Sequence, residues 1–274
     1  MIRVLALVMG LVLSGCAGQA GSPPSVQPSA TPQATSLISP RLTVSSQSAS
    51  ASPSGAAAVL PLVNGCSETS PCELSPGTWV TAGPFAFIPG LTITLPTPWV
   101  SHEQDLGEFR LNPANSPDDQ MLMWKDIAAI TSDGTTRLVP GIPRTVDGLT
   151  EYLKGNSDFV VSKEREVIIA SGINARTYVV AVSASARTKD KGCPVFPHCV
   201  DLLTDPAHWG PNGAYGIGAP ETVRLYLMTV GRADDTHLFV IALDAPNATE
   251  LEGFTKLALP AISTISLPPV IGNQ

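Results

Sequence analysis

The stretch Thr222-Val223-Arg224-Leu225-Tyr226-Leu227-Met228-Thr229-Val230 decides the fold class. In it Val223, Leu225 and Leu227 alternate with Thr222, Arg224 and Tyr226, which is the period of a β-strand with one face in a core. The turn-forming run 231–235 follows, and the apolar run 236–243 returns. This pattern predicts an antiparallel hairpin, the strongest one in the chain.

Further strands are expected on both sides of a first helix. They are 78–81, 91–95, 108–111, 120–124 with an extension to 130, 159–170, 173–183 and a last strand at 262–267. The charges at 163–166 indicate a turn or a sheet edge within 159–170, and the run 178–182 is typical of an inner strand. Residues 193–220 are expected to form a long loop.

Two helices interrupt the strands. Thr145 can cap a helix over 146–154, and Asn247 can cap a second one with apolar positions Leu251, Phe254, Leu257 and Ala258. Runs of strands with few helices predict an α+β fold. We expect a mainly antiparallel, twisted sheet that is partly covered by two or more helices.

The N-terminus carries the clearest targeting signal. Arg3 precedes an apolar run over 4–13, which is too short to span a bilayer and fits the apolar region of a signal peptide. The box Leu13-Ser14-Gly15-Cys16 resembles the lipobox of bacterial lipoproteins. This resemblance implies cleavage of the signal peptide 1–15 and a diacylglyceryl group on Cys16, which anchors the protein outside the cytoplasm to the cell membrane or the outer membrane. The alternative is an ordinary secretory signal followed by a chance cysteine.

Residues 16–59 are rich in Ser, Ala and Pro, and their only charge is Arg41. Such a composition predicts a disordered tether, which either carries the domain away from the membrane or keeps the lipid signal accessible. The globular domain is expected over 60–268, with a tail at 269–274. All 23 acidic residues and 14 of the 16 basic ones lie in this domain. Its acidity excludes a nucleic-acid binder.

Four further cysteines form two pairs of equal spacing, Cys66 with Cys72 and Cys193 with Cys199. In an exported chain they predict two disulfides, for which three connectivities exist. Local pairing is favoured because each pair flanks a proline-bearing loop. A zinc site made of Cys193, His198, Cys199 and His208 is disfavoured, because the cysteine spacing is too long and an oxidised pair cannot bind metal. No metal or cofactor is expected.

The run Leu91-Thr92-Ile93-Thr94-Leu95-Pro96-Thr97-Pro98-Trp99, with Phe87 before it, resembles the opening strand and Pro-x-x-Trp exit of the Mog1/PsbP-like fold. Over about 77–267 the chain is similar to exported lipoproteins of the LpqN kind. The loop around Cys193 and Cys199, with its continuation to Pro220, departs from the smaller members. The resemblance implies a binding or accessory protein, because those members share no catalytic residues.

Two predicted loops combine an aromatic with an ionisable side chain, as small-ligand pockets do: Trp99 with His102, and Asp205 with His208 and Trp209. The alternative is that each Trp caps the core. His237 is expected to be an exposed strand residue. Residues 213–218 are Gly-rich without a phosphate-loop pattern and are expected to form a flexible loop.

The sequence therefore favours a membrane-anchored, non-enzymatic binding or accessory protein of the cell envelope. Its partner would be an envelope protein or a small ligand. The alternative is an exported hydrolase with a site near the 193–220 loop that uses His208 and Asp205. No G-x-S-x-G sequence accompanies this pair.

Overall fold

The computed structural model describes residues 59–63, 66–67, 69–83, 86–104, 106–131, 137–169, 172–186, 199–210, 213–232 and 235–268. The predicted signal peptide, Cys16 and the predicted tether up to residue 58 lie outside these residues. Cys193, His198 and the tail 269–274 lie outside them as well.

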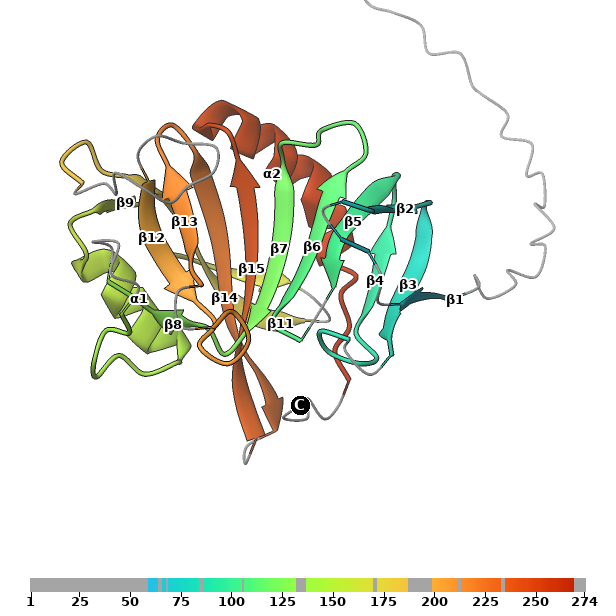
Figure 1. The fold of residues 1–274 in the computed structure, drawn as a ribbon, viewed down its shortest axis with the longest axis horizontal. Coiled ribbons are helices and arrows are strands. Elements are labelled where there is room, and N and C mark those ends of the chain that lie inside the picture. Colours follow the sequence, from blue (N-terminus) through green and yellow to red (C-terminus); the bar gives the residue numbers. More distant parts are fainter. Residues whose placement is uncertain are drawn as a thin grey trace, which may run out of the picture. The chain divides into compact units, whose positions relative to one another are not determined.

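The predicted hairpin forms the centre of the largest sheet. β14 (Thr222–Arg232) and β15 (Asp235–Ala245) pair antiparallel along their whole length, from Thr222 opposite Ala245 to Arg232 opposite Asp235. The nine-stranded sheet has the order β10-β11-β14-β15-β7-β6-β5-β2, with β9 also on β11, and all its pairs are antiparallel (Figure 1). Its other strands are β2 (Cys72–Leu74), β5 (Trp99–Gln104), β6 (Glu108–Pro113), β7 (Gln120–Lys125), β9 (Phe159–Val161), β10 (Arg165–Ile169) and β11 (Ile173–Val182).

Two three-stranded sheets accompany it. One has the order β1-β3-β4, built from β1 (Val59–Val63), β3 (Gly77–Ala82) and β4 (Thr92–Leu95), with β1 parallel to β3. The other has the order β13-β12-β8, built from β8 (Ala128–Ala129), β12 (Cys199–Thr204) and β13 (Tyr215–Gly218).

Two helices and the β13-β12-β8 sheet cover the two faces of the large sheet. Because strand side chains alternate between faces, β15 sends Phe239 and Ile241 into one core and Val240 into another. α2 (Ala248–Ile262) closes the first core with Phe254. α1 (Val146–Gly155) and β12 close the second. The expected fold class is confirmed at this level: a mainly antiparallel sheet with two helices.

Both helix caps agree with the sequence, but the last strand was predicted wrongly. Thr145 Oγ1 accepts from the Gly148 amide at 3.1 Å, and Asn247 Oδ1 accepts from the amides of residues 249 and 250. α2 continues past Pro260 because Ala261 and Ile262 are fully buried in the core. Of the expected strand 262–267, only Ser266 forms a bridge, to Thr92.

The expected long loop 193–220 was also wrong in part. It contains β12, in which all six residues are buried, and β13, which includes four residues of the Gly-rich run expected to be a flexible loop. The polar residues Asp201 and Thr204 mask the strand in the sequence, because both of its faces are buried and no apolar alternation remains.

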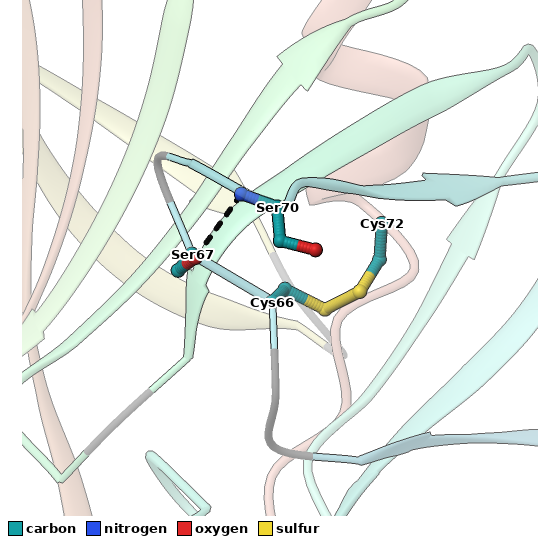
Figure 2. The surroundings of a disulfide bond; sticks show 4 residues. All are labelled: Cys66, Ser67, Ser70 and Cys72. Atoms are coloured by element: carbon teal, nitrogen blue, oxygen red, sulfur yellow. Dashed lines mark hydrogen bonds between the residues drawn. A yellow bond between two sulfur atoms is a disulfide. The ribbon is translucent and has the colours of Figure 1, made fainter.

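One predicted disulfide is present. Cys66 and Cys72 are bonded, with their Cα atoms 5.3 Å apart. Within this ring the Ser70 amide donates to Ser67 Oγ at 3.1 Å (Figure 2). Cys199 is also disulfide-bonded, and its pairing with Cys193 stays a prediction.

Candidate functional site

Asp205 and His208 form a close pair in the turn that follows β12. His208 Nδ1 lies 2.6 Å from Asp205 Oδ2, while Asp205 Oδ1 accepts from the amides of Ala207 and His208. Side-chain capping of a turn in this way is typical of Asp. The Asp205 side chain is 3% exposed and that of His208 is 23% exposed. The structure therefore brings these two residues together, and Asp205 also holds the turn together.

The turn is packed against the loop between β5 and β6. A Cβ atom on Gly107 would lie 2.8 Å from the Cβ of His208 and 3.1 Å from Oδ2 of Asp205. Real Cβ atoms do not approach this closely, so only glycine fits at this position. The backbone of Gly107 thus covers one side of the Asp205–His208 pair.

Trp209 leads from this pair to a cluster of aromatic rings. Its ring meets that of Trp124 edge-on, with centroids 6.0 Å apart, and Trp124 also packs on Tyr215 at 4.8 Å. The indole nitrogen of the fully buried Trp124 donates to Glu108 Oε2 at 3.1 Å. Trp209 therefore packs on the core at this face of the sheet, as the alternative interpretation proposed.

Behind the aromatic rings lies a pair of carboxyl groups that sequence reasoning missed. The Tyr215 hydroxyl donates to Asp244 Oδ2 at 2.8 Å, and Glu221 Oε2 accepts from the Gly218 amide at 2.7 Å. Burial, with the nearby charge of Asp244, raises the pKa of Glu221 to about 9. Burial also raises the pKa of Asp244 to about 6, against the opposing effect of its hydrogen bonds with Glu221 and Tyr215. At neutral pH, Glu221 therefore keeps its proton and Asp244 is mainly ionised.

A signal for this pair exists in the sequence. Asp244 ends an otherwise apolar run that starts at Leu238, and it is 4% exposed. A charged residue inside such a run needs a partner. The partners of Asp244 are Tyr215 in β13 and Glu221 in the turn that follows β13. The sequence predicts a loop in this region, so it does not reveal them.

The structure does not join Trp99 and His102 to this site. They were expected in a loop, but they lie in β5, and Trp99 is fully buried with its ring 6.2 Å from that of Phe254. Phe254 belongs to α2, which covers the face opposite to that of Trp209. Trp99 is therefore a core residue, as the alternative interpretation proposed.

The expectation of an exposed His237 was wrong. Its side chain is 6% exposed and lies between two carboxylates, with Nδ1 2.6 Å from Asp126 Oδ2 and Nε2 3.0 Å from Asp235 Oδ1. Asp126 has a φ of 54° and exchanges backbone and side-chain hydrogen bonds with Leu238. This kink ends β7, which explains why the expected extension to residue 130 is broken.

Within the described ranges, no group of three or more His, Cys, Asp or Glu side chains is arranged to hold a metal ion. In the same ranges, no helix is long and apolar enough to cross a membrane. The chain matches no protein-family model, and no curated protein matches it either.

Proposed function

We propose that the chain is a lipid-anchored, extracytoplasmic protein of the cell envelope whose domain binds a partner or small ligand and catalyses no reaction. The lipobox-like sequence ending at Cys16, and the segment after it with Arg41 as its only charge, support the anchor. The observation that carries the binding role is the set of hydrogen bonds that Asp205 accepts within its own turn. Both of its carboxylate oxygens are committed to the turn 205–208, so its contact with His208 serves the local fold.

We also propose that the domain belongs to the Mog1/PsbP-like fold. In support, the antiparallel sheet lies between α2 on one face and α1 with a small sheet on the other. The Pro-x-x-Trp segment joins β4 to β5, and its Trp99 is a central core residue. This resemblance favours a binding or accessory role over an enzymatic one.

A second candidate function is an exported hydrolase, and one distance favours it. A histidine whose Nδ1 is held by a buried carboxylate has its other ring nitrogen in position to accept a proton from a nucleophile. His208 Nδ1 lies 2.6 Å from Oδ2 of the buried Asp205, which is this arrangement. Among the described residues, no hydroxyl or thiol is hydrogen-bonded to His208.

The two functions are separated by a turnover assay on membranes that carry the full chain. Aryl acetate and aryl butyrate esters serve as substrates, and a fluorophosphonate detects an activated serine. The binding role predicts the same hydrolysis rate and no labelling for the wild type and His208→Ala. Hydrolysis or labelling that depends on His208 would reject the binding role and establish the hydrolase.

A further inference from the structure

A cavity of about 160 Å³ lies where β10, β11, β14 and α2 meet, beside the turn between β9 and β10. Ser162 and Lys163 come from the turn between β9 and β10, and Arg165 begins β10. Residues from β11, β14 and α2 complete its wall, including Thr177, Arg224 and Glu252. We call this space the cationic cavity. None of these residues was predicted from the sequence to belong to a binding site, because the fold joins segments that are up to 90 positions apart.

The charges on its wall contrast with the rest of the domain. Lys163, Arg165 and Arg224 are positive and Glu252 is negative, which leaves an excess of two positive charges in a domain that is acidic overall. Arg224 and Glu252 form an ion pair, with Nη2 2.9 Å from Oε1. Lys163 and Arg165 are exposed and form no ion pair with another described residue.

Two buried polar atoms on the wall have unused bonding capacity. Thr177 is 4% exposed, and its hydroxyl makes no hydrogen bond within the described part of the chain. The Nε atom of Arg224 is buried and likewise makes none there. A buried polar group without a partner lowers the stability of the folded state, so native proteins rarely keep one without a reason. A ligand oxygen in the cavity would supply a partner.

Size and charge together indicate the chemistry of the ligand. A guanidinium group matches the geometry of phosphate and carboxylate oxygens, and a phosphate monoester carries a charge of about −1.5 to −2 at pH 7. That charge balances the excess on the wall. The cavity is smaller than the roughly 300–1,000 Å³ of pockets that enclose a whole drug-sized ligand. It therefore suits the phosphate end of a ligand whose remainder lies outside.

We propose that the cationic cavity binds the phosphate monoester group of a small ligand. Arg224 and Thr177 contact the phosphate from within, and Lys163 and Arg165 contact it from the surface. This inference rests on the proposed binding function and adds the class of ligand.

The position of the cavity favours a soluble ligand over a lipid headgroup. β10 and β2 form the opposite edges of the large sheet, and the cavity lies at the β10 edge. β2 leads directly into β3, with which the first described strand, β1, is paired. The first described strand, β1, thus lies at the side of the domain away from the cavity, as Figure 1 shows for β1 and β9.

The test is calorimetric titration of the full-length protein in detergent. The ligands are glycerol 3-phosphate, inorganic phosphate, acetate, and vesicles with and without phosphatidic acid. We expect saturable binding of glycerol 3-phosphate at one site and weaker binding of acetate. No saturable binding by a folded protein, or acetate binding as tight as that of the ester, overturns the proposal. If only the vesicles with phosphatidic acid bind, the bound group is still a phosphate monoester, but it belongs to a lipid and the soluble ligand is overturned.

Matched variants separate a specific cavity from general charge effects. Lys163→Gln with Arg165→Gln should weaken glycerol 3-phosphate binding at least tenfold. Arg137→Gln with Arg144→Gln removes the same charge from exposed positions outside the cavity and should leave binding unchanged. Equal weakening by the two double variants would overturn the proposal.

Two single variants have opposite expected effects. Glu252→Gln removes the only carboxylate among the residues of the cavity wall and should tighten binding several-fold. Thr177→Val should weaken binding several-fold without lowering the melting temperature, because its hydroxyl has no described partner. Weaker binding by Glu252→Gln, or unchanged binding by Thr177→Val, would count against the cavity. If the protein instead releases phosphate from glycerol 3-phosphate, it is an enzyme and the proposed non-enzymatic function is wrong. The assignment of the cationic cavity as a phosphate monoester site is then retained.

Discussion

The hydroxyl of Tyr215 donates a hydrogen bond to Oδ2 of Asp244 across 2.8 Å, which ties β13 of the small sheet to β15 of the large one. Glu221, which is half-buried, lies beside the buried Asp244. The two carboxyl groups cannot both ionise at neutral pH without a large cost. This relation makes the stability of the domain sensitive to pH.

Stability should fall as the pH rises above about 5. The pKa of Glu221 is raised from 4.5 to about 9 on folding, so the folded state holds a proton that the unfolded state releases in this window. The stabilisation is complete below the unfolded pKa and is lost as the pH rises through the folded one. Glu221→Gln mimics the protonated acid, and chemical denaturation between pH 5 and 9 should give it a flatter profile. The exposed Glu166→Gln is the control, and an unchanged slope in Glu221→Gln would contradict the assignment.

Tyr215→Phe should destabilise the domain by about 1.5–3 kcal/mol near pH 8, because it removes a hydrogen bond to a charged acceptor. Tyr152→Phe is a matched control. It removes a bond of 2.7 Å to the neutral carbonyl of Ile130 and should cost about 1 kcal/mol. The loss of stability in Tyr215→Phe should exceed that in Tyr152→Phe at pH 8, and this difference should shrink at pH 5, where Asp244 is largely protonated. An excess that does not depend on pH would rule out an ionised Asp244.

Gly107→Ala and Gly253→Ala should change stability in opposite directions. The first places a methyl group 2.8 Å from the His208 Cβ and should cost about 1–3 kcal/mol. The second adds a methyl group in open space on α2 and should stabilise the domain by about 0.5–1 kcal/mol, because alanine favours helix. Thermal melts of both variants measure the difference. Equal melting temperatures would mean that the turn 205–208 does not pack on Gly107.

The sequence predicted the central hairpin, both helices and their caps, because long apolar periods and capping residues are local signals. It missed β12, whose burial on both faces leaves no period to detect, and β13, whose two glycines favour a loop in the sequence. Asp205 and His208 were named together because both lie in one predicted loop beside Trp209. Glu221 with Asp244, and Arg224 with Thr177, were not, because strand pairing alone brings these residues together.

A non-reduced digest should contain a peptide pair linked through Cys66 and Cys72, and a second one linked through Cys193 and Cys199. The first linkage is present in the structure. Cys66→Ser with Cys72→Ser should cost about 2 kcal/mol, which is the loop-entropy effect of a small ring. Mass spectrometry reads the linkages and a thermal melt reads the loss. A linkage between Cys66 and Cys193 would contradict local pairing.

The proposed role depends most directly on the lipid anchor, and mass spectrometry of the intact protein extracted from membranes tests it. We expect a mature chain that begins at Cys16 and carries a diacylglyceryl group on its sulfur. Cys16→Ala should give no such species. A chain that still begins at Met1, or one cut elsewhere with an unmodified Cys16, would rule out the lipid anchor.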